Sequence, residues 1–264
     1  MELGHRGAAV VVTGGASNIG RGIVHGFARE GSRILICDND AAQGARVVHE
    51  ARELGAAAVE LLVVDLTDHG SGGRVVDAAG AAFGAIDVLV NNAGWNAPGF
   101  LLEQTDRSLW QRTMETNLYS AIDCTQAAIP VMREHGGGAV VAISSDAAFG
   151  VVRQGIYGAS KAGMIAFART VAREEGRHGI RSNVVCPGLV IPEDDAVGEG
   201  SLWAKGRETI FDDAQTAWMV KQTPLRRLTS ADDVAAAVVW ISSPAAARQV
   251  TGQIVAVGGG TAMP

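Results

Sequence analysis

Several features that mark other classes of protein are scarce in this sequence of 264 residues. Lysine and arginine number 22 against 28 aspartates and glutamates, a net charge of −6, so the chain lacks the basic surface that nucleic-acid binding requires. No apolar run is long enough to cross a membrane, so we expect no membrane-spanning segment. The first strand-like run follows Met1 almost at once and leaves no room for a signal peptide. We therefore expect a cytoplasmic protein.

Patterns typical of disulfides and metal sites are also missing. The three cysteines, Cys37, Cys124 and Cys186, are an odd number, and they lie far apart in the sequence. Two of them fall in apolar strand-like runs. The six histidines show no metal-ligand spacing. We expect buried, reduced thiols and no metal site.

What the sequence does contain is a regular alternation of two patterns. Apolar residues make up 47% and charged residues 19%, values typical of a globular chain. Short apolar runs occur at 8–12, 33–37, 59–64, 88–90, 139–144, 182–186 and 254–257. Helical patterns occur at 19–30, 41–54, 68–83, 105–133, 157–177 and 231–242. This alternation predicts an α/β fold: a single doubly wound parallel sheet of about seven strands with helices on both faces. No repeat or linker divides the chain, so we expect one domain, 1–264.

A glycine-rich turn follows the first apolar run. Residues 13–22 read TGGASNIGRG, and the helical pattern after them places Ile19, Ile23 and Phe27 on one face. A strand, a glycine turn and a helix open a dinucleotide-binding βαβ unit. Glycines let the backbone approach a pyrophosphate, and the N–H groups at the helix start favour its charge. The alternative is an ordinary tight turn.

An acidic residue ends the second run. Asp38 lies eighteen residues after Gly20, where a carboxylate accepts hydrogen bonds from the adenosine ribose hydroxyls. The alternative is an N-cap for the next helix, a role that Asp40 can also fill. A carboxylate repels the 2′-phosphate of NADP, so we expect NAD as cofactor. Arg21 is the nearby base that would reverse this preference by pairing with the phosphate.

The third run also ends on an aspartate, Asp65, followed by Leu66. Its carboxylate either receives the adenine amino group or caps the helix expected near Asp68.

Further motifs follow in order along the chain. They are Asn91-Asn92-Ala93-Gly94, Asn117, Tyr157-Gly158-Ala159-Ser160-Lys161 and Pro187-Gly188. With the glycine turn, their order and spacing resemble the short-chain dehydrogenase/reductase family over about residues 8–260. The resemblance implies a Rossmann fold and an NAD-dependent oxidoreductase that interconverts a secondary alcohol and a ketone. Segments 87–95, 145–148, 183–188 and 251–253 are similar to 2-hydroxycyclohexanecarboxyl-CoA dehydrogenases, which adds cyclic and CoA-linked compounds to the expected substrates.

The resemblance also implies a cofactor site. Its residues are Gly14, Ser17, Asn18, Ile19, Gly20, Asp38, Asp65, Leu66, Asn91, Ala93, Gly94, Tyr157, Lys161, Pro187, Gly188 and Val190. The sequence departs from the family at Asn18, where a glycine is usual, and at Pro192, where a threonine is common. Asparagine tolerates the left-handed backbone better than most residues, so the turn can persist. Residues 189–224 are expected to form a lid over the substrate.

The expected catalytic residues are Asn117, Ser145, Tyr157 and Lys161. Tyr157 and Lys161 share a helix face, and a nearby ammonium together with the positive nicotinamide favours the phenolate, so Tyr157 can serve as general acid/base. The resemblance also implies that Lys161 binds the nicotinamide ribose and that Asn117 holds a water molecule that links Lys161 to solvent. One serine holds the substrate oxygen. Strand register favours Ser145 and the family's usual spacing favours Ser144; we choose Ser145 because loops absorb deletions more easily than strands.

Two other functions remain alternatives at this point. A sugar-nucleotide epimerase or dehydratase shares the Tyr-x-x-x-Lys pattern but usually carries a longer C-terminal domain. A nucleotide-sensing regulator does not need the full Ser–Tyr–Lys set that is intact here. The resemblance further implies a homotetramer in which helices 105–133 and 157–177 pair across a two-fold axis.

Overall fold

The apolar runs of the sequence form one parallel sheet. The computed structural model describes residues 2–192, 196–198, 201, 203 and 211–264. In this part of the chain the strands are β1 (Ala9–Thr13), β2 (Arg33–Asp38), β3 (Ala58–Val63), β4 (Val88–Asn91), β5 (Gly138–Ile143), β6 (Ile180–Pro187) and β7 (Ile254–Val257). All neighbours pair in parallel, in the order β3-β2-β1-β4-β5-β6-β7. The chain reverses its direction across the sheet between β1 and β4, which is the switch point where such folds bind ligands.

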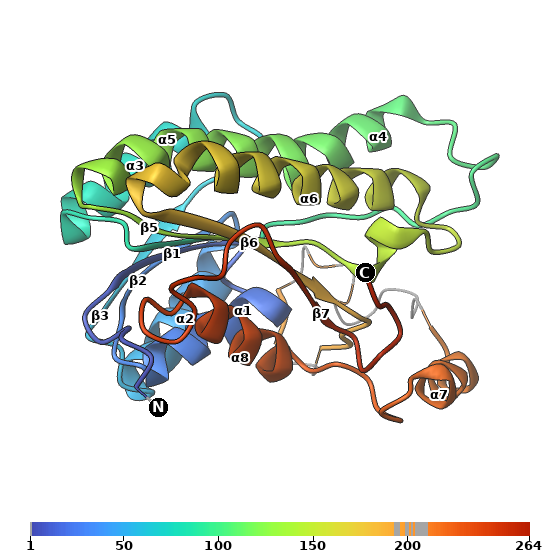
Figure 1. Cartoon of the computed structure of the whole chain (residues 1–264). Coiled ribbons are helices and arrows are strands. Elements are labelled where there is room, and N and C mark those ends of the chain that lie inside the picture. Colours follow the sequence, from blue (N-terminus) through green and yellow to red (C-terminus); the bar gives the residue numbers. More distant parts are fainter. Residues whose placement is uncertain (1, 193–195, 199–200, 202, 204–210) are drawn as a thin grey trace.

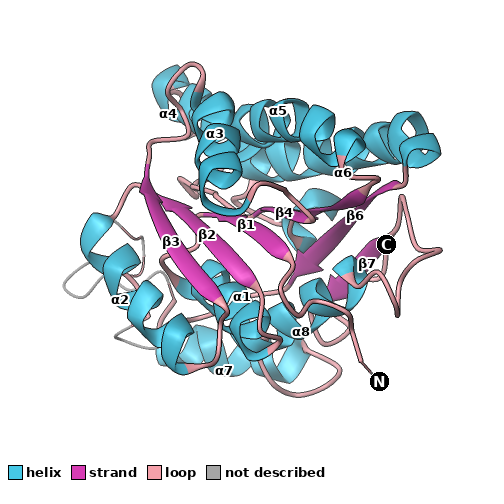
Figure 2. Ribbon diagram, turned by 90° about the vertical axis from the view of Figure 1, so that its left-hand side faces the viewer, coloured by secondary structure: helices cyan, strands magenta, loops and turns pink. Residues whose placement is uncertain are grey.

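Helices cover both faces of this sheet (Figures 1 and 2). They are α1 (Asn18–Arg29), α2 (Ala41–Glu53), α3 (Ser71–Phe83), α4 (Arg107–Met114), α5 (Ser120–Glu134), α6 (Gly155–Glu175), α7 (Asp213–Gln222) and α8 (Ala231–Ser242). In Figure 1, α3 to α6 lie above the sheet and α1, α2 and α8 lie beneath it. The predicted doubly wound α/β class is thus confirmed. None of the described helices is long and apolar enough to cross a membrane.

The central strands are apolar along their whole length because both of their faces are covered. Alternate residues of a strand point to opposite faces. Val10 and Ile34 pack with Phe27 of α1 in one core layer, whereas Val11 and Leu35 belong to the layer on the other face. Phe27 is fully buried, and burial of such a side chain contributes about 1.5–3 kcal/mol. These two layers hold the strand ends, and with them the site, in fixed positions.

The predicted helix 105–133 proved to be three consecutive segments. Between α4 and α5, residues Glu115–Tyr119 form a π-helical turn. A π-turn adds one residue to a turn while the backbone stays helical. The sequence reading therefore treated the three segments as one long helix.

The predicted lid, residues 189–224, is described only in part. Residues 193–195, 199–200, 202 and 204–210 of it lie outside the described residues. The described part includes α7, which the sequence reading did not identify. A capping box starts α7: the Asp212 carboxylate accepts from the Gln215 N–H, and the Gln215 side chain accepts from the Asp212 N–H.

Candidate active site

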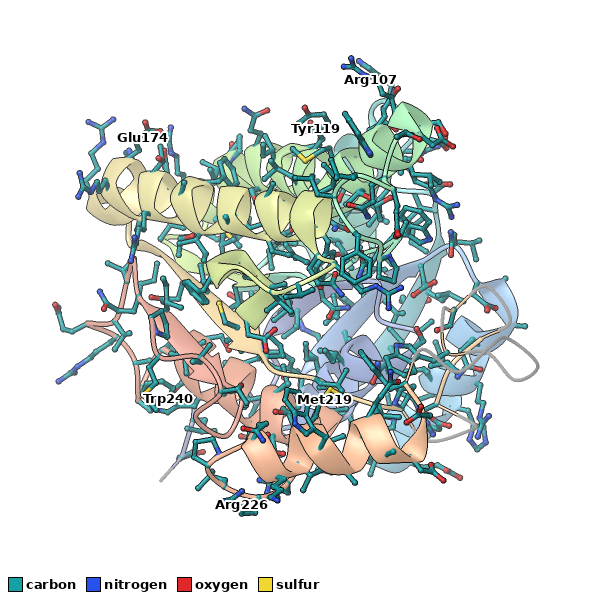
Figure 3. The ribbon with its side chains drawn as sticks, turned by 90° about the vertical axis from the view of Figure 1, so that its right-hand side faces the viewer. Arg107, Tyr119, Glu174, Met219, Arg226 and Trp240 are labelled. Atoms are coloured by element: carbon teal, nitrogen blue, oxygen red, sulfur yellow. The ribbon has the colours of Figure 1, made fainter. Side chains whose placement is uncertain are left out.

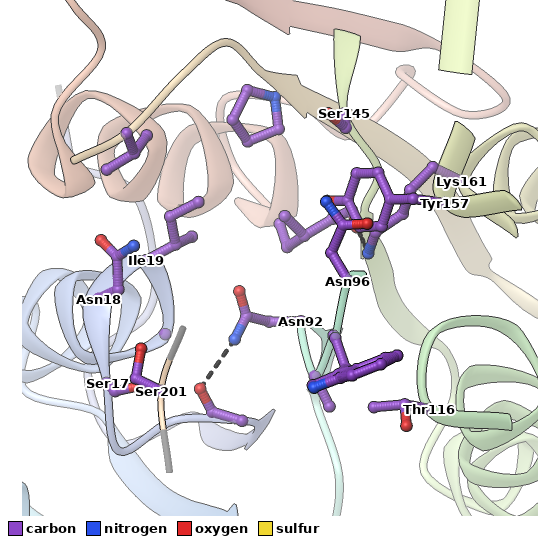
Figure 4. A pocket seen from close by; sticks show the side chains of 18 of the residues that line it. Ser17, Asn18, Ile19, Asn92, Asn96, Thr116, Ser145, Tyr157, Lys161 and Ser201 are labelled. Carbon is purple, nitrogen blue, oxygen red and sulfur yellow. Dashed lines mark hydrogen bonds between the residues drawn. The ribbon is translucent and has the colours of Figure 1, made fainter. Parts of the chain in front are cut away.

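A cavity of about 810 Å³ opens where the strands β1 to β6 end. The predicted residues that line it are Gly14, Ser17, Asn18, Ile19, Gly20, Asp38, Asp65, Leu66, Ala93, Gly94, Ser145, Tyr157, Lys161, Pro187, Gly188 and Val190. Figure 4 shows the glycine-turn residues at one side of this cavity and Tyr157 and Lys161 at the other, with Asn92 between them. Asn91 and Asn117, also predicted, are not part of the lining.

The backbone of the glycine turn has no side chain at Gly20 and adopts a left-handed conformation at Asn18. Asn18 has φ of 45°, the left-handed conformation that asparagine tolerates. A Cβ on Gly20 would lie 1.9 Å from the Gly14 carbonyl oxygen, so only glycine fits there. Ser17, the N-cap of α1, makes no side-chain hydrogen bond to the helix. The start of α1 is therefore not capped by its own serine and suits a pyrophosphate; the Asn18 N–H donates to the Ala196 carbonyl at 2.8 Å.

Asp38 lies in the cavity wall and is not a helix cap. The N-cap of α2 is Asp40, whose carboxylate accepts from the Gln43 N–H. Asp38 instead accepts from the Ala16 N–H at 2.9 Å and from the Asp40 N–H at 3.0 Å, which ties β2 to the glycine turn. Burial raises the pKa of Asp38, and these backbone hydrogen bonds oppose the shift.

Arg21, the base that would favour NADP, is directed elsewhere. Its Nε lies 2.8 Å from one carboxylate oxygen of Glu50 and its Nη2 lies 2.9 Å from the other. His25 also contacts Glu50, at 3.0 Å. Arg21 is not among the residues that line the cavity.

Asp65 and Leu66 line the cavity beyond β3. The Asp65 carboxylate accepts from the Thr67 N–H at 2.9 Å and from the Thr67 hydroxyl at 2.7 Å. These bonds lower the pKa of Asp65. Because α3 begins only at Ser71, Asp65 caps a turn and not the helix.

The two asparagines after β4 have different partners. Asn92 donates to the carbonyls of Thr13 and Gly14, at 3.0 and 2.8 Å, and so ties β4 to β1. Asn91 is buried and donates to the Thr125 hydroxyl of α5 at 2.9 Å, while its Oδ1 has no partner among the described residues. Asn91 therefore lies behind the cavity wall, and Asn92, Ala93 and Gly94 form its surface.

Tyr157 and Lys161 come from the first two turns of α6. Lys161 is 2% exposed, and its Nζ donates to the Ile143 carbonyl at the end of β5 at 2.8 Å. Its Nζ lies 5.7 Å from the centre of the Tyr157 ring. Burial lowers the pKa of Lys161 to about 8.

The two serines after β5 both border the cavity, but their side chains have different partners. Ser144 is buried and its hydroxyl donates to the Lys161 carbonyl at 2.8 Å. The Ser145 side chain lies beside Tyr157 and lowers the pKa of its phenol. Ser145 also accepts from the Ala147 N–H and donates to the Asp146 carboxylate, both at 3.1 Å.

The pKa of Tyr157 shifts opposite to the direction that the sequence suggested. Burial raises it to about 12, and the negative charge of Asp146 acts in the same direction. The Ser145 side chain opposes the shift. Removal from water disfavours the phenolate more than the neighbouring groups of the chain favour it. With the chain alone, Tyr157 therefore stays protonated at neutral pH.

Asn117 lies in the π-helical turn and is fully buried. Its Oδ1 accepts from the Trp95 N–H at 2.6 Å, and its Nδ2 donates to the Trp95 carbonyl and to the Ser160 hydroxyl, both at 3.0 Å. Ser160 in turn donates to the Tyr157 carbonyl. Asn117 thus joins the segment after β4 to the first turn of α6.

The cavity also contains residues that sequence reasoning missed. Asn96, Gln154 and Asp146 line the cavity. The Asn96 side chain donates to Gln154 at 2.7 Å, and Asp146 lies beside Ser145. Trp203, Phe211 and Met219 also line it, from the segment after β6 that was expected to cover the substrate. The position of Asp146, directly after a strand-end serine, was the one sequence signal that pointed to this group.

Comparison with known proteins agrees with this geometry. A family model described as Enoyl-(Acyl carrier protein) reductase matches residues 14–262. L-rhamnose 1-dehydrogenase (NAD(P)(+)) of Azotobacter vinelandii is 36% identical over 256 residues, 95% of each chain. Cis-4-hydroxycyclohexanecarboxylate dehydrogenase of Sinomonas cyclohexanicum is 36% identical over 252 residues, 95% of this chain and 94% of the relative.

A solved structure gives the same result. A 7α-hydroxysteroid dehydrogenase complexed with NADH and 7-oxo glycochenodeoxycholic acid superposes with a TM-score of 0.88 at 29% identity, over 98% of this chain and 96% of that chain. These relatives are named dehydrogenases, so the comparison does not favour the alternative functions of a regulator or an epimerase. The chain belongs to the short-chain dehydrogenase/reductase family, and it is an oxidoreductase that acts on CH–OH groups with a nicotinamide cofactor.

Proposed function

We propose that this chain interconverts a secondary alcohol and a ketone with NAD, with Tyr157 as general acid/base and Ser145 on the substrate oxygen. The observation that carries the proposal is that Ser145 and Tyr157 line the same cavity, with the Ser145 side chain close enough to lower the pKa of Tyr157, one helical turn from the buried Lys161. A substrate oxygen placed between the two hydroxyls contacts the proton donor, Tyr157, and the hydrogen-bond partner that polarises a carbonyl, Ser145.

The protonation state of Tyr157 suits the reduction of a ketone. Its pKa of about 12 in the chain alone keeps the phenol protonated at neutral pH, ready to give its proton to a developing alkoxide. When bound, the nicotinamide supplies or accepts the hydride, and its oxidised form carries the positive charge that favours the phenolate needed for oxidation. Lys161 adds a buried ammonium 5.7 Å from the ring.

Asn117 is proposed to support this arrangement from behind. Its side chain holds the backbone of Trp95 and the hydroxyl of Ser160, which fixes α6 relative to the end of β4. The second lone pair of its Oδ1 is the acceptor proposed to hold a water beside Lys161. A Cβ on Gly94 would lie 3.4 Å from the Lys161 Nζ and 3.5 Å from this Oδ1, so the two groups border the same small space.

NAD is the proposed cofactor. Asp38 presents its carboxylate where the adenosine ribose is expected, and it is held there by two backbone N–H groups. Arg21 is paired with Glu50 and does not reach the cavity. A 2′-phosphate would then meet a carboxylate without a compensating base from Arg21.

The substrate is proposed to be a small alcohol, with sugars and cyclic hydroxy acids as the model compounds because relatives are named for them. Residues 189–224 are the proposed lid, since its described residues Trp203, Phe211 and Met219 already line the cavity. The homotetramer also remains a proposal. Tyr119, 50% exposed on the outer surface of the α4–α6 layer (Figure 3), is a surface apolar residue that such pairing would cover.

The two serines provide a matched experiment. Ser145→Ala should lower kcat/KM by roughly 100-fold or more, because the substrate oxygen loses a hydrogen bond that is strongest in the transition state. Ser144→Ala removes a buried hydroxyl of the same size, 2.8 Å from the Lys161 carbonyl, without touching the cavity partner of Tyr157. Thermal unfolding of both variants controls for lost stability. Equal losses of activity, or a larger loss for Ser144→Ala, would reject the assignment of Ser145.

A further inference from the structure

Asp146 introduces an ionisable group next to the reacting oxygen. It opens the short 3₁₀ helix Asp146–Phe149, and this helix packs tightly against α6: a Cβ on Gly158 would lie 2.5 Å from the Ala147 carbonyl oxygen. The close packing fixes the carboxylate at the cavity wall, beside Ser145.

In the part of the chain that the structure describes, Asp146 receives fewer hydrogen bonds than its carboxylate can accept. A carboxylate has about four acceptor sites. Among the described residues its side chain receives the Ser145 hydroxyl at 3.1 Å and the Ala147 N–H. The side chain is half-buried, and burial raises its pKa. A carboxylate in this position is costly unless further donors reach it, and the open side of the cavity is where a ligand donor can arrive.

The pair formed by Ser145 and Asp146 offers acceptors to the cavity. The hydroxyl of Ser145 has one proton, which it gives to Asp146. The Ser145 oxygen already accepts from the Ala147 N–H, so the acceptor sites left for a further hydroxyl group are those of the Asp146 carboxylate. The Ser145 Oγ and the Asp146 Oδ1 lie 3.1 Å apart, a spacing comparable to that of the two oxygens on adjacent carbons of a diol. A substrate oxygen at Ser145 therefore places a neighbouring hydroxyl at Asp146.

The same end of the cavity carries further polar groups. Asn96 and Gln154 are hydrogen-bonded to each other at 2.7 Å and line the wall, with Asn96 on the Tyr157 side of the cavity (Figure 4). A carboxyamide pair of this kind binds hydroxyls and does not favour an apolar ring. Two separate elements, the segment after β4 and the loop before α6, thus present polar side chains beside the carboxylate.

We propose that Asp146 is a specificity-determining residue, which accepts a hydrogen bond from a hydroxyl next to the reacting one and so selects vicinal diols and polyols over simple alcohols. This inference rests on the proposed function, because it takes Ser145 as the partner of the reacting oxygen. The selection follows from the half-buried acceptor: a substrate without the second hydroxyl displaces water from the cavity and leaves the remaining acceptor sites of the carboxylate without a donor.

The test compares cis-1,2-cyclohexanediol with cyclohexanol as NAD-dependent substrates. The quantity measured is the ratio of their kcat/KM values in the wild-type protein, in Asp146→Ala and in Asp146→Asn. The wild-type ratio should exceed one, and Asp146→Ala should lower it by roughly tenfold or more. Asp146→Asn keeps a neutral acceptor oxygen at the same place, so it should give an intermediate ratio. Asp77→Asn, an exposed carboxylate on α3, is the matched control and should keep the wild-type ratio.

Several results would overturn this role of Asp146. They are a wild-type ratio of one or less, turnover of neither compound, a ratio that is unchanged in both variants, and a parallel loss on both substrates. The ratio cancels any general loss of folded protein, and the conservative Asn variant keeps the test valid if Asp146→Ala is unstable. Failure of the proposed function itself would be recognised separately, because Tyr157→Phe would then retain turnover of whichever substrate the protein accepts.

Discussion

Replacement of Asp38 tests how this chain distinguishes NAD from NADP. The carboxylate would lie in contact with the 2′-phosphate of NADP. Two unit charges about 4 Å apart repel by about 1 kcal/mol in water and about 4 kcal/mol at the effective dielectric near a protein surface. Asp38 is half-buried, so the repulsion lies between these limits. The ribose hydroxyls of NAD gain hydrogen bonds at the same place. We therefore expect NAD to bind at least tenfold more tightly than NADP.

Two substitutions separate charge from structure at Asp38. Asp38→Asn removes the charge and keeps an acceptor oxygen for one of the Ala16 and Asp40 N–H groups, which bond to different oxygens of Asp38. Asp38→Ala leaves both N–H groups without their acceptor, at a cost of about 1–3 kcal/mol each in stability. Calorimetric dissociation constants for NAD and NADP should converge in Asp38→Asn, while urea unfolding should show the larger destabilisation in Asp38→Ala. Tighter binding of NADP by the wild-type protein, or a ratio untouched by Asp38→Asn, would refute the reasoning.

Two further predictions concern stability. Burial lowers the pKa of Lys161 from 10.5 to about 8, so between these values the unfolded chain binds more protons and stability rises with pH. Across this window the free energy of urea unfolding of the wild type, relative to Lys161→Met, should rise by up to about 3 kcal/mol; a constant difference would contradict a buried, easily deprotonated amine. Gly20→Ala places a Cβ 1.9 Å from the Gly14 carbonyl oxygen and should cost about 1–3 kcal/mol and weaken NAD binding. The matched Gly73→Ala, with nothing within 4 Å of its Cβ, should be neutral or stabilising in the same thermal and binding assays.

The sheet was predictable because both of its faces are buried. A strand covered on both sides is a continuous apolar run, such as β1 with all five residues buried, and such runs are visible without any alignment. The glycine turn was predictable for a different reason: the close approach at Gly20 excludes every other residue.

Other parts of the site depend on contacts that no local pattern encodes. The π-helical turn at Asn117 lies within a continuous helical segment, and the sequence reading did not separate it from the α-helices on either side. The pKa of Tyr157 depends on how deeply its hydroxyl is buried, which spacing to Lys161 cannot reveal. Whether Ser144 or Ser145 lies beside Tyr157 is decided by where β5 ends, and strand ends are uncertain by a residue or two in any sequence reading. The pairing of Arg21 with Glu50 joins two helices.

The central claim is that Tyr157 moves the proton during hydride transfer between an alcohol carbon and NAD. Its most direct test is the rate of NADH formation by the wild-type protein and by Tyr157→Phe, with the best substrate from a panel of cyclic alcohols, 3-hydroxyacyl-CoA esters and dihydrodiols. Phenylalanine keeps the ring and removes the hydroxyl. The rate should fall by roughly 100-fold or more, while the calorimetric dissociation constant for NAD stays within a few fold of the wild-type value. Near-normal turnover in Tyr157→Phe would contradict the account.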